Sequence, residues 1–368
     1  MPKEWNNPNN PFNSAKALMW RENFEGFAKG DYLPPVTVDT DPSSRCNYLC
    51  RWCNADSIIQ KKGQKEISRD QLFRLSDFYA EWGIHSSCVA GGGEPLMNKS
   101  TPDFLIHLRK NGIEPGLITN GSLIDDRVAE IIAKTCRWVG FSMDAGTAET
   151  YIKVKGLPDK FSYLFEKVIS NIEMIADFVK DLNTKCDVCY KYLLHPLNAR
   201  EIYTAAKLAK EIGVHDFHLR PVGWDNVPKT AGQESPNYTG LYEEIDDQIE
   251  RSMQLEDDNF HFYGIRHKFK PDFSRQINFS RCWAAPLILT FGADGNCHLC
   301  FDMRGREDLI LCRHDPDPHE VLKHWNSQRH KDIIKNIDVN KCPRCTFGAY
   351  NKIVEDVFIE DKMCRYFP

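Results

Sequence analysis

The sequence of 368 residues contains no apolar run of transmembrane length, and its polar first residues lack the apolar core of a signal peptide. It contains no long basic run, and its formal net charge is −5. These absences argue against a membrane or nucleic acid as the main partner and predict a cytoplasmic protein. Internal repeats and low-complexity tracts are also missing, and 42% hydrophobic with 27% charged residues is the composition of a globular protein.

The fourteen cysteines are the unusual part of the composition. In a chain of this size without a signal peptide, they indicate metal sites in a reducing compartment rather than disulfides. Three lie between residues 46 and 53, and seven lie between 282 and 364. Because the chain exceeds the size at which a single core stops growing, we expect a large domain around the first group and a smaller lobe around the second.

The first group carries the clearest chemical signal. A short β-branched run, Val36–Thr40, leads into a turn-rich loop that holds Cys46, Cys50 and Cys53 in the spacing C-x3-C-x2-C. A structural zinc site takes four protein ligands, whereas a 4Fe–4S cluster held by three thiolates keeps one iron open for a substrate or cofactor. A zinc knuckle that borrows a fourth ligand from elsewhere is the alternative.

Strand and helix patterns alternate from residue 36 to about 222. The predicted strands are Val36–Thr40, Ser87–Ala90, Gly116–Thr119, Trp138–Met143, Cys186–Leu194 and Asp216–Pro221. Capping signals start helices at Ser68 and Asn198. These units predict an α/β fold, a parallel sheet curved into a partial (β/α)6 TIM-like barrel, with ligands at the C-terminal strand ends. A turn-rich loop, an acidic helix and another strand follow at 222–238, about 239–256 and Asn259–Ile265.

Polar residues mark the predicted ligand-binding edge. After the second strand, Gly92 and Gly93 let the backbone approach a ligand and Glu94 can accept from an ammonium group, although a plain strand-to-helix turn is the alternative. Asn120 lies in a turn after the third strand. Polar residues alternate along the fifth strand (Cys189, Lys191 and His195) and along the sixth (Asp216, His218 and Arg220). Side chains two residues apart point to the same face of a strand, so each set either lines a substrate pocket or faces solvent.

The C-terminal cysteines are enough for a second, closed metal site. Four of them supply thiolates for one site: Cys282, Cys300, Cys342 and Cys345. Their spacing does not distinguish a zinc ion from a 4Fe–4S cluster. Cys297, Cys312 and Cys364 are left over. Three alternatives are open for these cysteines. They hold a second, irregular metal site, or one of them, such as Cys297, replaces one of the four ligands, or they are ordinary thiols. A left-over cysteine near the substrate could also donate a hydrogen atom.

Three features together resemble the radical S-adenosylmethionine (SAM) superfamily. They are the cysteine spacing after a first strand, the aromatic Trp52 before the third cysteine, and the motif Gly91–Pro95 at its distance along the chain from the cysteines. The resemblance implies that SAM chelates the open iron of the cluster. An electron from the cluster would then cleave SAM to methionine and a 5′-deoxyadenosyl radical, which abstracts a substrate hydrogen atom. It also implies a reducing electron donor such as flavodoxin or ferredoxin.

The same resemblance implies roles for single residues. Glu94 would bind the SAM amino group, and Ser142 stands in a segment similar to S-x-D-G, whose serine contacts SAM. Lys155 stands where relatives often carry an arginine that pairs with the SAM carboxylate, but lysine lacks the planar fork, and a solvated lysine is the alternative. The residues expected to bind the cofactor are Trp52, Gly92, Gly93, Glu94, Asn120, Ser142, Asp144, Lys155 and Arg220.

The C-terminal pattern, Cys282-x12-Gly295-x4-Cys300, resembles the opening of the SPASM/twitch extension, whose cysteines hold auxiliary 4Fe–4S clusters. A full SPASM lobe has further cysteines after Cys345, but Asn351 stands at the first of those positions. The resemblance therefore implies the shorter twitch version with one auxiliary cluster, and a second only if the left-over cysteines contribute. Its best-known carriers are aminocyclitol dehydrogenases.

The resemblance spans residues 36 to 364. We expect an N-terminal extension at 1–35, the partial barrel at 36–240, a connecting helix and strand at 241–281, and the twitch/SPASM lobe at 282–368. The leading hypothesis is SAM-dependent hydrogen abstraction from a small polar substrate, a sugar or aminocyclitol, that leads to dehydrogenation or epimerisation.

Candidate bases for that reaction are Lys191, His195 and Asp187, and Cys297 is a candidate thiol donor. Alternatives are the maturation of a ribosomal peptide by thioether formation, epimerisation or crosslinking, and a non-catalytic metal-binding scaffold. The substrate and the oligomeric state stay open.

Overall fold

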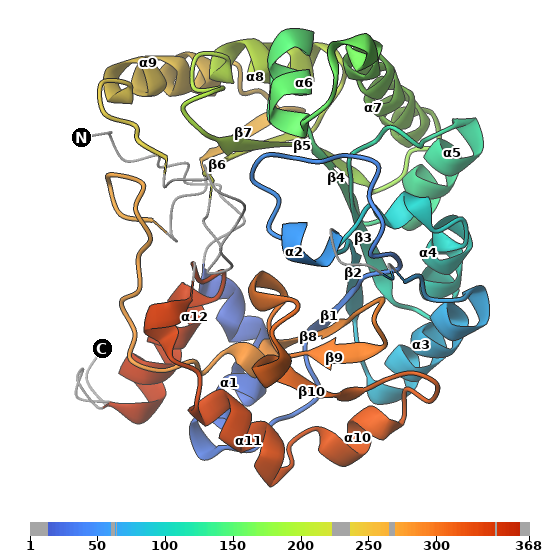
Figure 1. Ribbon diagram of the computed structural model, residues 1–368, viewed down its shortest axis with the longest axis vertical. Coiled ribbons are helices and arrows are strands. Elements are labelled where there is room, and N and C mark those ends of the chain that lie inside the picture. The colour runs from blue at the N-terminus through green and yellow to red at the C-terminus, as the bar shows by residue number, and fades with distance from the viewer. Residues whose placement is uncertain are drawn as a thin grey trace.

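The computed structural model describes residues 14–59, 63, 65–222, 236–264, 269–342 and 344–360. Within these residues the strands form one sheet in the order β10-β9-β8-β1-β2-β3-β4-β5-β6-β7. Neighbours from β8 through to β7 are parallel, and β8–β9 and β9–β10 are antiparallel. The sheet curves without closing (Figure 1), which confirms the predicted partial barrel. The strands are β1 (Thr37–Thr40), β2 (Ser86–Val89), β3 (Glu114–Thr119), β4 (Trp138–Ser142), β5 (Asp187–Leu194), β6 (Asp216–Pro221), β7 (His261–Gly264), β8 (Ile288–Phe291), β9 (Asn296–His298) and β10 (Ile310–Arg313).

Helices cover the outer side of the curve, and the loop with α2 (Asp56–Ile59) lies inside it (Figure 1). The outer helices are α3 (Arg69–Trp82), α4 (Thr101–Lys110), α5 (Asp126–Thr135), α6 (Ala148–Lys155), α7 (Tyr163–Asp181), α8 (Ile202–Glu211) and α9 (Tyr242–Met253). Both ends of the described chain pack at one end of the sheet, as η1 (Ser14–Trp20), α1 (Arg21–Lys29), α10 (Glu320–His324), α11 (Gln328–Lys335), α12 (Gly348–Ile353) and the π-helix η8 (Val354–Ile359). Short 3-10 turns are η2 (Pro95–Met97), η3 (Asp159–Phe161), η4 (Ala285–Leu287), η5 (Phe301–Met303), η6 (Glu307–Leu309) and η7 (Val339–Lys341).

The apolar core lies between the sheet and the outer helices. Val139, Phe141 and Phe217, on the outward face of their strands, have no exposed surface and belong to one hydrophobic cluster with the helices. Removing such side chains from water is the main stabilising term of the fold. The outer helices leave the concave face uncovered, and polar side chains of β5 and β6 extend from that face.

Each strand predicted between residues 36 and 222 is present, with ends shifted by at most two residues. The helix predicted from Asn198 was placed wrongly at its start, because α8 begins at Ile202. Asn198 does not cap it: its amide donates to the carbonyls of Asp144 and Leu193 over 2.8 and 2.9 Å. The Asn198 side chain thus joins the end of β5 to the segment that follows β4, and is not available to cap the helix. Most of the predicted loop at 222–238 lies outside the described residues.

The sheet extends beyond the six predicted strands at both edges. β7 lies within the further strand predicted at Asn259–Ile265 and pairs with β6, and β8, from the predicted C-terminal lobe, pairs in parallel with β1. Side chains strengthen the second junction: Gln71 of α3 donates to the His314 carbonyl over 3.2 Å, and Trp325 donates to the Leu33 carbonyl over 2.9 Å. The C-terminal residues are thus bonded to the strand that leads into the first cysteine group.

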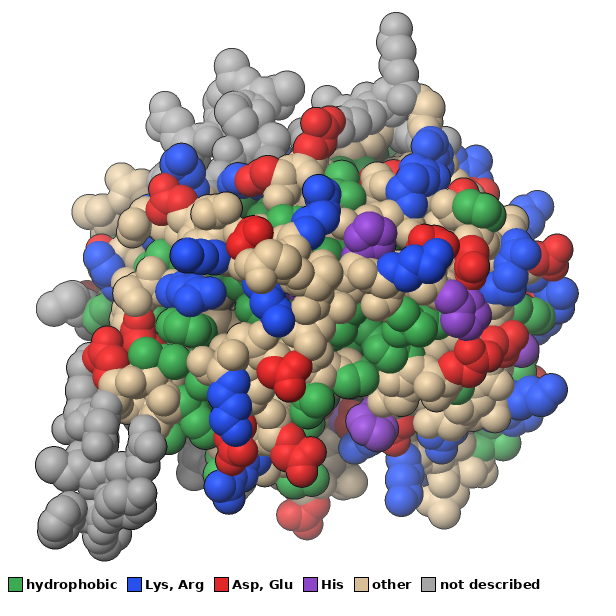
Figure 2. Space-filling model, turned by 90° about the horizontal axis from the view of Figure 1, so that it is seen from below, with side chains coloured by type: hydrophobic (Ala, Val, Ile, Leu, Met, Phe, Trp, Pro, Cys, Tyr) green, Lys and Arg blue, Asp and Glu red, His purple; other side chains and the backbone are tan. Residues whose placement is uncertain are grey.

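No helix among the described residues is long and apolar enough to cross a membrane. On the face seen in Figure 2, basic and acidic side chains are interspersed among the described residues, and no basic patch stands alone there.

Replacing Glu201 by alanine should lower the free energy of unfolding by about 3 kcal/mol. Its carboxylate accepts from Gly146 N, Thr147 Oγ1 and Thr150 Oγ1 over 2.8, 2.8 and 2.6 Å, and these donors would lose their partner. Urea unfolding of the two proteins measures the difference. The control is Glu211→Ala on the same helix, an exposed residue whose loss should change stability by less than about 0.5 kcal/mol. Equal losses in both variants would contradict the assignment.

Candidate functional site

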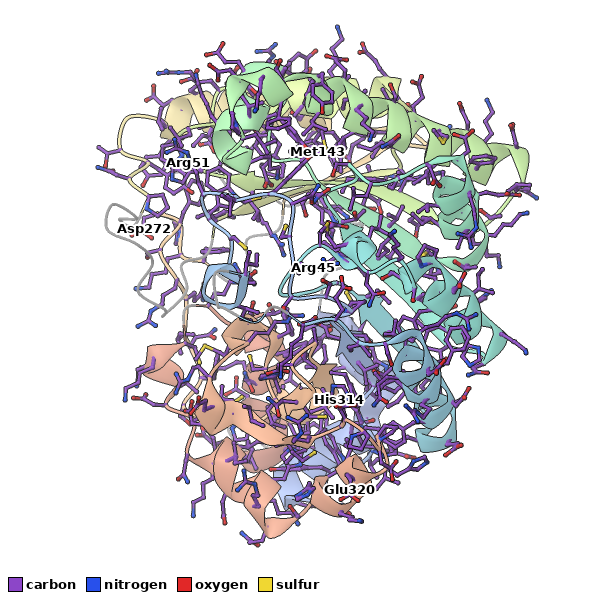
Figure 3. All side chains as sticks on the ribbon, turned by 45° about the vertical axis from the view of Figure 1, so that its right-hand side comes forward. Arg45, Arg51, Met143, Asp272, His314 and Glu320 are labelled. Carbon is purple, nitrogen blue, oxygen red and sulfur yellow. The ribbon has the colours of Figure 1, made fainter. Side chains whose placement is uncertain are left out.

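The loop with the first cysteine group lies inside the curve of the sheet, where Figure 3 marks its two sides with Arg45 and Arg51. Cys46, Cys50 and Cys53 are half-buried, and none forms a disulfide within the described chain. Burial raises the pKa of Cys46 to about 12 and also raises the pKa of Cys50. A bound cation would reverse this preference and hold the sulfurs as thiolates. Three neighbouring cysteines without disulfides are a donor set that suits a metal centre.

The end of α6 holds this loop by backbone hydrogen bonds. Leu49 N donates to the Lys155 carbonyl over 3.2 Å, and Arg51 N donates to the Val154 carbonyl over 3.0 Å. Gly156 ends the helix at φ +64°, and a Cβ there would lie 2.1 Å from the Leu49 carbonyl oxygen. Glycine is required by both the backbone angle and the close approach.

The glycine turn after β2 holds the other side of the loop. Gly93 N donates to the Ser43 carbonyl over 3.1 Å, and Glu94 N donates to the Arg45 carbonyl over 2.8 Å. A Cβ at Gly93 would lie 2.1 Å from the Arg45 oxygen, whereas one at Gly92 would meet a side chain. The sequence predicted that these glycines let the backbone approach a ligand. In the structure, it is the backbone of the cysteine loop that lies against them.

Glu94 is 3% exposed and lies at the ends of β2 and β3. Its carboxylate accepts from Thr119 Oγ1 over 2.6 Å, from Asn120 N over 2.8 Å and from Leu96 N over 3.2 Å. Burial nevertheless raises the pKa of Glu94 to about 7. A cation that reached this carboxylate would favour the ionised form. The Asn120 amide donates to the Asn47 side chain over 2.8 Å, which ties the end of β3 to the cysteine loop.

Asp144 and Lys155 form a buried ion pair that the sequence did not reveal. Lys155 Nζ lies 2.7 Å from Asp144 Oδ2, and the two side chains are 1% and 6% exposed. Asp144 has φ 58°, and its other oxygen accepts from Leu193 N over 2.8 Å. The charges of Lys155 and Asp144 both act on the Cys50 thiol, with Lys155 the stronger. The sequence predicts that Asp144 and Lys155 each bind the cofactor, whereas in the structure they bind each other beside the cysteine loop.

Trp52 and His195 are stacked, with ring centroids 4.8 Å apart and an interplanar angle of 23°. Burial, with a smaller contribution from the Arg51 charge, lowers the pKa of His195 to about 4. His195 Nδ1 accepts from Leu197 N over 3.1 Å. His195 lies beyond the end of β5, against the cysteine loop, and is neutral at pH 7 as a candidate base.

The concave face of β5 and β6 carries the predicted polar residues. The Cys189 thiol and His218 Nε2 each lie 3.8 Å from Asp216 Oδ2, and the three ligand-type atoms lie within 4.8 Å of one another. Burial lowers the pKa of His218 to about 4. Lys191 and Arg220 extend from the same face, and Ser142 at the end of β4 is level with Lys191 in the strand register.

The four cysteines of the predicted second metal site lie near one another in the C-terminal residues. Cys282, Cys300, Cys342 and Cys345 act on one another electrostatically, and burial raises the pKa of each. Asn351, which occupies the position of a missing cysteine, donates to Cys345 Sγ over 3.4 Å. Its oxygen accepts from the backbone N–H of residues 283 and 284, next to Cys282. The asparagine thus joins two segments of the group.

Cys297 lies apart from those four thiols. It is fully buried, and it lies opposite Cys312 in the register of β9 and β10. Besides burial, Cys312 and Asp294 raise the pKa of its thiol. Its thiol also acts on Tyr79 of α3, which lies outside the sheet. Its role as a ligand or hydrogen donor stays a prediction, and Cys364 lies outside the described residues.

Arg304 connects the second cysteine group to β1. Its guanidinium donates to Asp39 over 2.8 Å and to Asp41 over 2.7 Å, and all three side chains are at most 8% exposed. It also lines a cavity of about 230 Å³ together with Gly92 and His298. No sequence motif indicated Arg304, since its partners are more than 260 residues away.

Residues 40–209 match the model of the Radical SAM superfamily. Curated relatives include the Fe-coproporphyrin III synthase of Methanosarcina barkeri, 32% identical over 34% of this chain and 31% of the relative. The GTP 3′,8-cyclase of Clostridium perfringens is 27% identical over 52% of this chain and 56% of the relative. The chain therefore spans about a third to a half of the length of such relatives.

Solved structures with a similar fold cover more of the chain. SuiB of Streptococcus suis bound to its precursor peptide SuiA has a TM-score of 0.64 at 15% identity, over 95% of this chain and 80% of SuiB. AnSMEcpe with bound SAM has a TM-score of 0.58 at 18% identity, over 82% and 83% of the two chains. At such low identities the likeness establishes the fold alone.

Replacing Lys155 by methionine should lower the free energy of unfolding by about 3 kcal/mol or more, because it leaves the buried Asp144 carboxylate without its cation. The matched control is Lys153→Met on the same helix, where the lysine is 56% exposed and pairs only with Glu149. The control should change stability by less than about 0.5 kcal/mol. Urea unfolding measures both, and a tolerated Lys155→Met would refute the structural importance of the pair.

Proposed function

We propose that this chain, which belongs to the radical SAM superfamily over residues 40–209, cleaves SAM reductively and abstracts a hydrogen atom from a polar substrate held in the concave face of its sheet. One observation carries the proposal. Backbone hydrogen bonds and two obligatory glycines hold three half-buried thiols beside a buried carboxylate, at the C-terminal edge of a parallel sheet. Ligands bind at this edge in open α/β sheets.

Cys46, Cys50 and Cys53 would hold a 4Fe–4S cluster, the cofactor that this superfamily uses together with SAM. When bound, the cluster and SAM supply a 5′-deoxyadenosyl radical as the hydrogen-abstracting species. The chain's own residues position and shield this chemistry. Lys155 contributes a fixed positive charge near Cys50, and Trp52 with its stacked His195 covers the loop.

Glu94 is the residue we assign to the SAM ammonium group, because it is a buried carboxylate whose ionisation a cation would favour. Gly92 and Gly93 would let the cysteine loop pack closely beside Glu94, and Asn120 and Ser142 stand at neighbouring strand ends. The direct pairing of Lys155 with the cofactor carboxylate stays a prediction. Its ion pair with Asp144 favours a positioning role instead.

Cys282, Cys300, Cys342 and Cys345 would hold one auxiliary 4Fe–4S cluster, with structural zinc as the alternative for the same ligands. An auxiliary cluster would accept an electron from the substrate radical and so favour dehydrogenation, whereas a thiol donor would favour epimerisation. A one-electron donor such as flavodoxin or ferredoxin would supply the reductive step. The fold is shared with enzymes named for quite different substrates, so the substrate class must come from this chain's own residues.

Replacing Cys46, Cys50 and Cys53 together by alanine should reduce about eight irons per chain to about four after anaerobic reconstitution, and abolish 5′-deoxyadenosine formation. Iron, sulfide and zinc counts with product analysis measure this. About twelve irons in the wild type would add a third cluster. A fall from about four irons to none with zinc present would make the C-terminal site structural. A triple variant that still cleaves SAM would refute the proposal.

Replacing Glu94 by glutamine should raise the SAM dissociation constant about tenfold or more while the iron count stays unchanged. The amide keeps the shape of the carboxylate but loses the charge that the ammonium requires. Equilibrium binding to the reconstituted protein measures this. Glu130→Gln is the control, an exposed glutamate on α5 whose partner is Lys134. Unchanged SAM affinity in Glu94→Gln would remove Glu94 from the cofactor site.

A further inference from the structure

Two cations extend from the concave face of the sheet without a counter-charge. Lys191 of β5 and Arg220 of β6 are half-buried. Neither the Lys191 ammonium nor the Arg220 guanidinium makes a hydrogen bond or an ion pair to any residue that the structure describes. Buried or half-buried charges are normally paired, so this pair requires an explanation.

The position of Lys191 is defined by packing. Its ammonium lies 5.0 Å from the ring centroid of Trp138, a cation–π contact. Its stem crosses β4 at Gly140, where an added Cβ would lie 1.9 Å from Lys191 Cε, and the Trp138 ring in turn lies over Gly116, where an added Cβ would come within 2.3 Å of the ring. Two glycines on the concave face thus make room for the ring and the lysine, and hold the ammonium in place.

The carboxylates nearest to these cations already have partners. Asp144 binds Lys155 over 2.7 Å, and Asp302 accepts from Arg344 over 2.9 Å. Asp216 has the Cys189 thiol and His218 at 3.8 Å. Asp39 and Asp41 share Arg304. None of these carboxylates makes an ion pair with Lys191 or Arg220 within the described residues.

The two cations also oppose each other. Burial and then the Arg220 charge lower the pKa of Lys191, and burial and then the Arg344 charge lower the pKa of Arg220 to about 10. Arg220 therefore remains charged at neutral pH. An anion between them would relieve the repulsion and the loss of hydration together. The cation–π contact with Trp138 would explain Lys191 as a structural residue, but Arg220 has no such contact with a described residue.

The strand register places the pair below the cysteine loop. Arg220 is level with Leu193, two residues beyond Lys191 toward the C-terminal edge of the sheet, or about 7 Å further along the strands. Charges at Asp144 and Asp302 act on Arg220, which puts it between the strand end and the C-terminal residues. A molecule anchored here would extend upward to the cysteine loop.

We propose that Lys191 and Arg220 bind a carboxylate or phosphate group of the substrate, an inference that rests on the proposed function. Lysine supplies a point charge, and arginine supplies the planar fork that suits either group. The substrate is then an anionic molecule, and a cationic aminocyclitol of the kind expected from the resemblance would be repelled. Lys191 becomes a binding residue rather than the base considered above.

The test must separate a substrate anion from the carboxylate of SAM itself. Inorganic phosphate and acetate are the probes, added to the reconstituted protein under anaerobic conditions with SAM at saturation. Their dissociation constants follow from the concentration-dependent rise in melting temperature. The variants are Lys191→Met and Arg220→Met. Lys207→Met on α8, an exposed lysine paired only with Glu211, is the control. The SAM dissociation constant is measured for each protein.

At least one probe should bind the SAM-loaded wild type, and its dissociation constant should rise about tenfold or more in either variant. The control and the SAM affinities should be unchanged. Lys191→Arg and Arg220→Lys keep the charge and should retain most of the binding, which keeps the test readable if a methionine variant fails to fold.

Three results would overturn the proposal: neither probe binds, the variants bind the probe as well as the wild type does, or the probe binds only without SAM while Arg220→Met weakens SAM about tenfold. The last result would assign the pair to the cofactor. Absence of SAM cleavage by the wild type would refute the proposed function separately, because the anion titration needs no turnover.

Discussion

The docking of one loop by backbone hydrogen bonds is the constraint on which the site depends. The loop with Cys46, Cys50 and Cys53 has little structure of its own, and the end of α6 and the turn after β2 hold it from two sides. Both contacts bring carbonyl oxygens to within 2.1 Å of where a Cβ would stand, so Gly93 and Gly156 are necessary. The cysteine spacing can present its thiols together only because these two glycines let the backbones approach.

The sheet joins the two cysteine groups into one unit. β1, which leads into the first group, is bonded to β2 on one side and to β8 on the other. The Arg304 ion pairs with Asp39 and Asp41 strengthen the same junction from the second group. Removing Arg304 would leave both carboxylates buried and without their cation. The relative position of the two groups is therefore set by strand pairing and by a buried charge network.

Charge pairing also divides the interior into structural and functional parts. Lys155 and Arg304 are matched to carboxylates and stabilise the fold, whereas Lys191 and Arg220 face the concave space and make no ion pair with a described residue. An unmatched cation costs free energy in the empty protein, and a ligand that supplies the counter-charge recovers it. This arrangement is what lets the chain's own residues restrict the substrate when the fold does not.

The sequence by itself determined the strands, the curved parallel sheet and the cysteine groups. Alternation of period two, and short motifs such as Gly92–Glu94, are local properties that survive folding. Only the tertiary structure decided that Lys155 binds Asp144, that the Asn198 amide bonds to the segment after β4 and does not cap α8, and that Cys297 lies apart from the four cysteines. It also decided which cations stay unmatched. An ion pair depends on the distance between two side chains, and that distance is set by the packing of elements far apart in the chain.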